Sequence, residues 1–215
     1  IDQIYMVGCG DSVAALRGTR FFIEELLGIP CKEEDAMDFA YYNSSAVDEN
    51  TLVLTLSSSG RTIRVVEALL AARARGAQTL ALSNTADSPL MRAATAGVII
   101  HASRKGWPTQ SSTSAMAAVI QLAFEMAKCL GIEKAAAFET EFQKIPDLMV
   151  KAAKMTEEKM KALAAVLYKK NMFFFAGAGP FFTCAEYGAA KVKESTPAYA
   201  MSVPMEEFHH YNTVK

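Results

Sequence analysis

Residues 51–62 read TLVLTLSSSGRT, an apolar and β-branched run followed by serines, a glycine and a threonine. The first six residues are typical of a strand buried on both faces, because such a strand needs a continuous apolar run. The last six include four hydroxyl side chains, and a helical pattern begins after them. Strand, polar loop and helix in this order predict a βα unit whose loop lies at the carboxyl end of a parallel sheet.

The same alternation extends along the first two thirds of the chain. Further strands are expected at residues 4–8, 78–83 and 97–101, because each is a short apolar run bounded by turn residues. Helical periods between the strands predict helices that cover the sheet. The predicted fold class is α/β, a three-layer sandwich in which helices flank a parallel sheet in the flavodoxin-like manner.

A second start of the pattern follows a long helical segment. Residues 172–177 again read as a strand, and Gly177 and Gly179 lie 169 residues after Gly8 and Gly10. This constant offset favours an internal duplication, although two similar βα units in one sheet would give the same glycines. We predict a first domain at 1–133, a helical connector at 134–169 and an incomplete second copy at 170–215.

Bulk composition narrows the class of partner. Lys and Arg number 22 against 23 Asp and Glu, the formal net charge is −1, and 51% of residues are hydrophobic. Without a basic stripe beside aromatic residues, this balance argues against nucleic acid and anionic membrane as partners. The longest apolar stretches are too short to span a bilayer. Small molecules and other protein subunits are the expected partners.

The four cysteines, Cys9, Cys31, Cys129 and Cys184, are scattered without the spacing of a metal site or a redox motif, and the chain has only three histidines. We therefore expect reduced thiols in a cytoplasmic protein. Neither a metal nor another cofactor is expected.

The loop at 57–62 has the composition of a phosphate site. Backbone amides at a helix start and several hydroxyls offer many donors to a doubly charged anion, and Gly60 permits close approach. Each hydrogen bond to a charged acceptor supplies about 1.5–3 kcal/mol, against about 0.3–1 kcal/mol from the helix dipole, so the donors decide affinity. The alternative is that these residues only cap the helix. The predicted phosphate ligands are Ser57, Ser58, Ser59, Thr62 and, if the strands at 4–8 and 51–56 are neighbours, Ser12.

Together these motifs resemble the SIS (sugar isomerase) family. The resemblance rests on Cys9-Gly10-Asp11-Ser12 after the first strand and on the pattern Ser-x-Ser-Gly-x-Thr at 57–62, and it covers most of residues 4–130. It implies a phosphorylated sugar as the substrate and a homodimer with shared active sites. The apolar helix at 111–130 is the expected dimer surface. The implied sugar contacts are Gly10, Ser112 and Glu207.

The second half is most similar to the isomerase domain of glucosamine-6-phosphate synthase and to the fructosamine-6-phosphate deglycases. Their Lys-x-Lys-Glu motif matches residues 191–194, and the histidine of their Glu-x-x-His-Gly-Pro motif matches His210, 16 residues after Glu194. Tyr211-Asn212 stands where that family has Gly-Pro. By resemblance, Glu194 moves a proton between C1 and C2, His210 opens the sugar ring, and Lys191 stabilises the enediolate.

The expected protein is an enzyme, either an aldose/ketose isomerase or a ketosamine-6-phosphate deglycase, because both reactions pass through a C1/C2 enol. A non-catalytic sugar-phosphate sensor and a compact single-domain isomerase of seven- or five-carbon sugar phosphates are the rivals. For the site itself, His209 competes with His210. A solvated helix face is the alternative for Glu194, since most Lys/Glu clusters lie on the surface.

Overall fold

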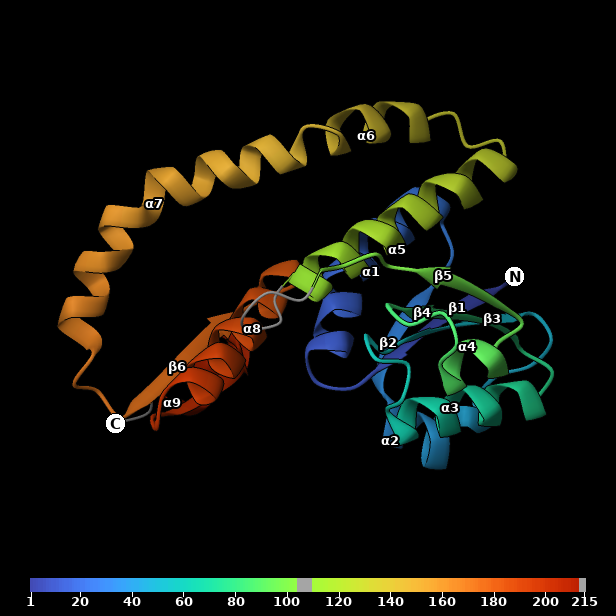
Figure 1. Cartoon of the computed structure of the whole chain (residues 1–215), viewed down its shortest axis with the longest axis horizontal. Helices are drawn as coiled ribbons and strands as arrows, with labels where there is room; N and C mark the ends of the chain where they lie inside the picture. Colours follow the sequence, from blue (N-terminus) through green and yellow to red (C-terminus); the bar gives the residue numbers. More distant parts are fainter. Residues whose placement is uncertain (104–109, 213–215) are drawn as a thin grey trace.

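A computed structural model describes residues 1–103 and 110–212 of the chain. In these residues the strands form a five-stranded parallel sheet, ordered β2-β1-β3-β4-β5, and a separate parallel pair, β6 and β7. Figure 1 shows the larger sheet with helices on both faces, which confirms the predicted three-layer α/β fold. Its strands are β1 (Gln3–Gly8), β2 (Cys31–Asp35), β3 (Thr51–Leu56), β4 (Gln78–Ser83) and β5 (Ala96–Ile99).

Alternating side chains along β1 explain the two layers of helices. Ile4 and Met6 belong to the core under α1 (Asp11–Leu27) and α5 (Gln110–Cys129). Tyr5 and Val7 belong to the core on the opposite face. Because successive strand residues point to opposite faces, a strand that is apolar throughout must be covered on both sides. The second face is covered by α2 (Ala36–Asp38), the short turns Phe39–Asn43 and Ser44–Ala46, α3 (Ile63–Ala74) and α4 (Pro89–Ala93).

Strands β2 and β7 (Tyr199–Pro204) are not predicted by the sequence patterns. β2 reads CKEED and pairs with β1 alone, at the edge of the sheet. An edge strand pairs through its backbone on one side and tolerates charged side chains, so it needs no apolar run.

The connector is helical, as expected. It consists of α6 (Ala135–Phe142) and α7 (Ile145–Leu167), with Pro146 in the first turn of α7, where a missing N–H is tolerated. The predicted break near Pro146 is therefore present. Residues 145–166 are all exposed, and Figure 1 shows α7 extending away from the larger sheet.

One apolar face of helix α5 is buried in the core that it shares with α1. Ala115, Val119, Ala123 and Phe124 are at most 2% exposed and belong to the core shared with α1. These buried residues serve the fold of one chain. Met116, Ala117 and Ile120 of the same helix instead line a cavity of about 430 Å³, so the expected dimer surface on α5 stays a prediction.

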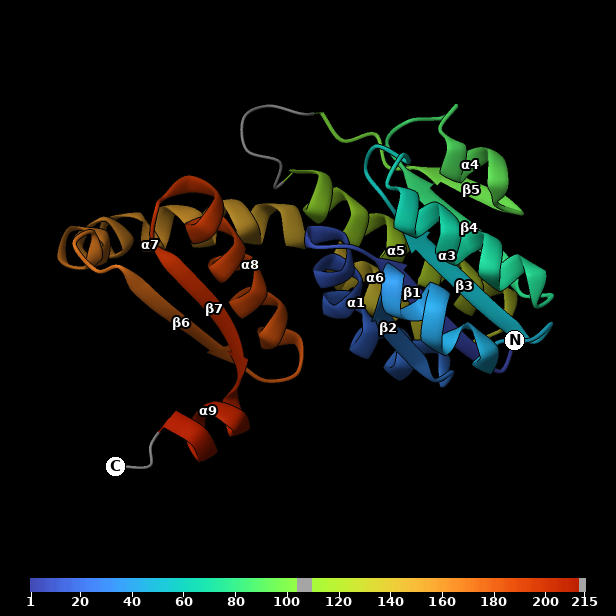
Figure 2. The same ribbon diagram turned by 90° about the horizontal axis from the view of Figure 1, so that it is seen from below.

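The parallel pair of β6 (Met172–Gly177) and β7 is connected by α8 (Pro180–Ser195) and followed by α9 (Met205–Asn212). Figure 2 shows α8 between this pair and α1. Gly10 has φ 54° and ψ −126°, and Gly179 has φ 53° and ψ −133°, so the turns before α1 and α8 share one backbone shape. This likeness supports the predicted duplication. The duplication and the three-part division of the chain stay predictions.

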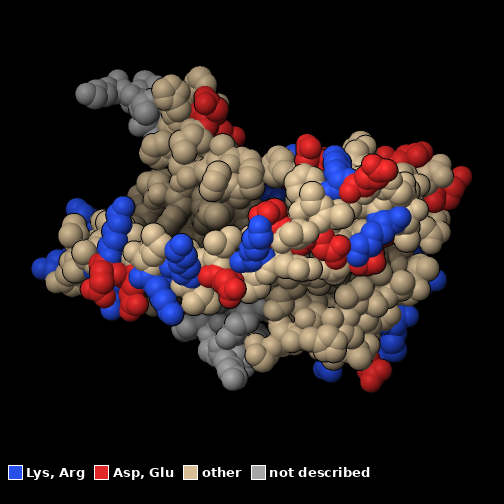
Figure 3. Space-filling model, turned by 90° about the horizontal axis from the view of Figure 1, so that it is seen from above, with Lys and Arg blue, Asp and Glu red and all other residues tan. Residues whose placement is uncertain are grey.

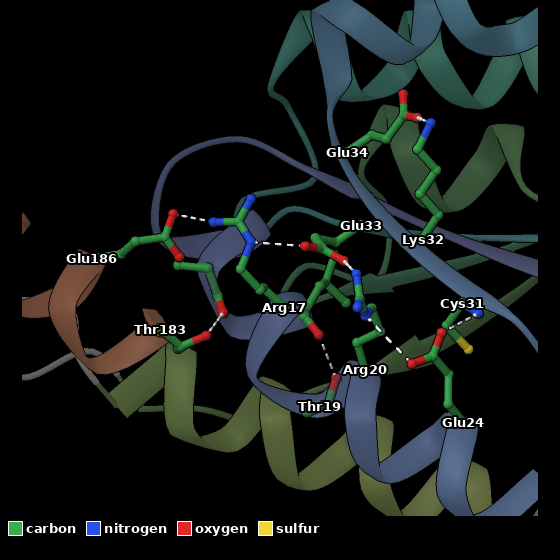
Figure 4. Close-up of polar contacts among 12 residues, drawn as sticks. Arg17, Thr19, Arg20, Glu24, Cys31, Lys32, Glu33, Glu34, Thr183 and Glu186 are labelled. Carbon is green, nitrogen blue, oxygen red and sulfur yellow. Dashed lines mark hydrogen bonds and ion pairs between the residues drawn. The ribbon is translucent and has the colours of Figure 1, made fainter. Parts of the chain in front are cut away.

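Helices α1 and α8 are joined by polar contacts (Figure 4). Arg17 donates from Nε to Glu33 Oε1 at 2.9 Å and pairs with Glu186 of α8. Thr183 Oγ1 donates to the carbonyl of Ala14 at 3.3 Å. Burial lowers the pKa of Arg17, but its hydrogen bonds with Glu186 and Glu33 outweigh that cost and raise the pKa. In the Arg17–Glu186 and Ala14–Thr183 contacts the partners lie 169 residues apart.

The described part of the chain holds no helix with the length and apolar character needed to cross a membrane. Lys and Arg side chains are interspersed with Asp and Glu side chains over the face seen in Figure 3. That mixture agrees with the near-neutral net charge of −1.

Candidate functional site

The loops after β1 and β3 open at the same edge of the sheet. β1 and β3 are hydrogen-bonded neighbours, with Val7 opposite Thr55, so the loops that follow them meet at the carboxyl edge. Ser12 and Ser58 line one cavity of about 140 Å³, as expected for loops on adjacent strands. The other lining residues are Asp11, Leu56, Ile100, Ser111, Ser112 and Ala115.

The hydroxyls of 57–62 are organised within the loop. Ser57 is 3% exposed, accepts a hydrogen bond from the Gly60 amide at 3.1 Å and lies 3.0 Å from Thr62 Oγ1. Thr62 is the N-cap of α3, but among the described residues its side chain makes no capping hydrogen bond. Ser59 is exposed and accepts from the Arg61 amide at 3.2 Å. Helix capping alone therefore does not account for this group of hydroxyls.

Gly60 anchors the loop to α4. Its φ is 62°, a conformation that side chains disfavour. A Cβ at this position would lie 2.8 Å from Ser83 Oγ and closer still to Ser88 Oγ and Cβ. The Gly60 carbonyl accepts from the Leu90 amide at 3.1 Å. Close packing and the positive φ both require glycine, so the loop has one defined path.

A second cavity, of about 500 Å³, lies beside α8 and includes Glu194, Gly10 and Asp11 in its lining. Next to it, Lys191 Nζ donates to Asp11 Oδ2 at 2.7 Å and to Glu194 Oε2 at 2.8 Å. Burial lowers the pKa of Lys191, but the hydrogen bonds with Asp11 and Glu194 outweigh it and the pKa is raised. Lys191 is thus a charged ammonium between two carboxylates.

Two residues of this cluster, Asp11 and Tyr187, are not among the residues predicted from sequence. Tyr187 donates from its hydroxyl to the Asp11 carbonyl at 2.8 Å. Burial raises the pKa of Tyr187 to about 12, although a hydrogen bond with Ser112 opposes the shift, so the phenol stays neutral. The four-residue spacing of Tyr187 and Lys191 places them on one helix face, a signal that the sequence does contain.

The predicted residues on α9 lie apart from both cavities. His210 is 70% exposed, and its Nε2 lies 3.8 Å from Glu206 Oε2. Glu207 and the competing His209 are exposed as well. None of these three lines the 140 Å³ or the 500 Å³ cavity. His210 follows Glu194 by 16 residues, as in the motif, but this spacing does not place the histidine in the cavity that Glu194 lines.

The described residues include no group of three or more His, Cys, Asp or Glu side chains positioned to hold a metal ion. Cys9, Cys31, Cys129 and Cys184 are free thiols. Burial raises the pKa of Cys31 to about 12, so this thiol is protonated at neutral pH.

Sequence comparisons place the chain among known proteins. The SIS domain model matches residues 1–126. A glutamine–fructose-6-phosphate aminotransferase (isomerizing) of Thermococcus kodakarensis is 33% identical over 97% of this chain and 35% of its own length. The protein of the same name from Clostridium tetani is 32% identical over 98% of this chain and 35% of its length. The chain thus spans about a third of the length of these relatives.

Solved structures agree in fold. The C-terminal domain of glucosamine-fructose-6-phosphate aminotransferase from Francisella tularensis has a TM-score of 0.89 at 24% identity, over 97% of this chain and 60% of its own. A glucosamine-6-phosphate deaminase from Thermotoga maritima has a TM-score of 0.79 at 21% identity, over 100% of this chain and 65% of its own. At these identities the likeness concerns the fold. Because the domain model covers more than half of its residues, the chain belongs to the SIS domain family.

Proposed function

We propose that this chain carries the phosphosugar site of an enzyme that acts at C1 and C2 of a 6-phosphorylated ketose or amino sugar. The activity is that of an aldose/ketose isomerase or a ketosamine-6-phosphate deglycase. One observation carries the proposal: Asp11 lines both the hydroxyl-rich cavity and the cavity that contains Glu194. A cradle for phosphate and a carboxylate base therefore lie on either side of one residue. The names of the relatives above also refer to 6-phosphorylated sugars.

In this proposal the phosphate accepts hydrogen bonds from Ser12, Ser58, Ser59 and Thr62. Each such bond to a charged acceptor contributes about 1.5–3 kcal/mol. Ser57 supports these donors from within the loop, because its hydroxyl contacts the Thr62 hydroxyl and the Gly60 amide. The sugar extends from the phosphate past Ser112, which is 7% exposed in the wall of the smaller cavity, and past Gly10.

Glu194 is the proposed proton shuttle. It removes the proton from the carbon beside the carbonyl, which leaves an enediolate, and returns a proton to the neighbouring carbon. The ammonium of Lys191 stabilises the negative charge that develops on oxygen. With a ketosamine, the same transfer from C1 to C2 leaves an imine at C1. Water then hydrolyses the imine to an aldehyde and a free amine.

His210 is proposed to open the sugar ring from a neighbouring subunit. Its side chain is 70% exposed and is therefore accessible to a second chain. The proposal therefore includes a homodimer with shared sites, in which Glu207 contacts the sugar from the same helix. A cytoplasmic location and the lack of a cofactor also stay predictions.

The test is deuterium exchange followed by NMR. The intact protein is incubated in D2O with fructose 6-phosphate or fructosamine 6-phosphate, and deuterium at C1 or C2 reports the enediol. Glu194→Gln should abolish exchange and leave affinity within about threefold, since the phosphate donors are intact. Ser59→Ala with Thr62→Ala should instead weaken binding, by about 1.5–3 kcal/mol for each lost charged hydrogen bond.

Glu158→Gln is the matched control, because Glu158 pairs with Lys161 at 2.9 Å on the exposed face of α7. It should change neither quantity. Exchange that persists in Glu194→Gln would remove Glu194 from the mechanism. Binding without exchange in the unaltered protein would favour the sugar-phosphate sensor, and unchanged affinity in the Ser59/Thr62 variant would move the phosphate elsewhere.

A further inference from the structure

Helix α8 contacts Asp11 twice. The Asp11 carboxylate accepts from Lys191 Nζ at 2.7 Å, and its carbonyl accepts from the Tyr187 hydroxyl at 2.8 Å. Asp11 is the first residue of α1 and precedes Ser12, which lines the smaller cavity. The two contacts therefore attach the start of α1, together with the hydroxyl cradle, to the helix that bears Glu194.

The ammonium of Lys191 is shared between two carboxylates at almost equal distances, 2.7 Å to Asp11 and 2.8 Å to Glu194. The side chains of Lys191 and Asp11 are 26% and 27% exposed, whereas Glu194 is 39% exposed. Solvent screens the less exposed pair less. Asp11 is thus the stronger competitor for the ammonium, and Glu194 is the carboxylate that can more readily release it.

From this competition we propose that Asp11 is a positioning residue, which holds Lys191 so that Glu194 is free to move a proton. The inference rests on the function proposed above. Without the Asp11 carboxylate, the ammonium would pair with Glu194 alone. That pairing would occupy the base and withdraw the cation from the developing enediolate, while the phosphate donors would be unaffected.

Kinetics of Asp11 variants test this role. Asp11→Ala should lower kcat by at least about tenfold, and by no more than the roughly 10²–10⁴-fold that the positioned acid or base itself contributes. KM should stay within about threefold, because uniform binding is retained. Asp11→Glu should recover part of kcat, since it restores a carboxylate. In a Lys191→Met background, Asp11→Ala should have no further effect, because Asp11 acts through Lys191.

Arg17→Gln is the control for a purely structural effect. Arg17 also pairs across α1 and α8, its side chain is 23% exposed, and it lines neither cavity of the proposed site. This variant should unfold more easily than the unaltered protein and keep kcat within about twofold.

A second measurement does not depend on turnover. Acylation of lysine amines, followed by mass spectrometry, should modify Lys191 several times faster in Asp11→Ala than in the unaltered protein or in Arg17→Gln. Lack of turnover in the unaltered protein would refute the proposed function. If the unaltered protein turns over normally, any of three results would refute the role of Asp11 alone. These are unchanged labelling of Lys191 in Asp11→Ala, a kcat of Asp11→Ala within about twofold of the unaltered protein, and a rise in KM that parallels the fall in kcat.

Discussion

Replacing Gly60 with alanine perturbs the loop between β3 and α3 by one methyl group. Gly60 has φ 62°, and left-handed backbone costs a residue with a side chain about 1–2 kcal/mol. The added Cβ would lie 2.8 Å from Ser83 Oγ and closer to the Ser88 side chain. Both serines are 0% exposed, so neither can move into solvent, and such overpacking costs about 1–3 kcal/mol. We expect Gly60→Ala to lower the free energy of unfolding by about 2–5 kcal/mol.

Equilibrium denaturation in urea measures this loss, and Gly28→Ala is its matched control. Gly28 has φ 69°, and among the described residues no heavy atom lies within 4 Å of an added Cβ. Gly28→Ala should therefore lose only the backbone contribution of about 1–2 kcal/mol. The difference between the two variants isolates the clash. Adding Ser88→Gly to Gly60→Ala should recover most of that difference, because glycine at an N-cap costs only a few tenths of a kcal/mol.

The reasoning is refuted if Gly60→Ala loses no more stability than Gly28→Ala, or if Ser88→Gly rescues nothing. Either result would mean that the loop is not held by its packing against α4. The phosphate cradle would then need another explanation for its shape.

Two further predictions concern Tyr187 and His210. Burial raises the pKa of Tyr187 from 10.0 to about 12, so the folded protein retains this proton after the unfolded chain has lost it. The stability that Tyr187 contributes is therefore complete below about pH 10 and is lost as the pH rises toward 12. Tyr187→Phe should flatten the decline in unfolding free energy measured over that pH range, whereas Tyr168→Phe, at a residue 72% exposed, should leave it steep; equal slopes in Tyr187→Phe and the unaltered protein would contradict the linkage. For His210, mixing inactive Glu194→Gln and His210→Ala proteins should restore part of the exchange activity if each site takes its glutamate and histidine from different chains. A mixture as inactive as its components, under conditions in which mass spectrometry finds mixed dimers, would refute the shared site.

Much of the first domain follows from local patterns. The run TLVLTL predicts β3, and the hydroxyl loop after it fixes the end of the sheet at which a site forms. Ser12 and Ser58 share a cavity because loops on neighbouring parallel strands meet there, which requires only the correct strand order. Such features depend on local patterns together with the order of the strands.

The remaining features depend on contacts between distant residues. β2 is a charged edge strand, which an apolar pattern cannot reveal. Asp11 meets Lys191 across 180 residues, and no spacing rule predicts that contact. For His210 the sequence supplies a motif, but the side chain is 70% exposed and lines neither cavity of the candidate site.

The contact between Arg17 and Glu186 has a consequence for how two halves of such a chain can associate. In a symmetric pair made of two copies of one half, residues near the symmetry axis face their own copies. Arginine would then face arginine, or glutamate would face glutamate, and like charges would repel. Opposite charges 169 residues apart instead make α1 a better neighbour for α8 than for another α1. Joining the halves in one polypeptide would thus permit an asymmetry that independent identical subunits cannot acquire.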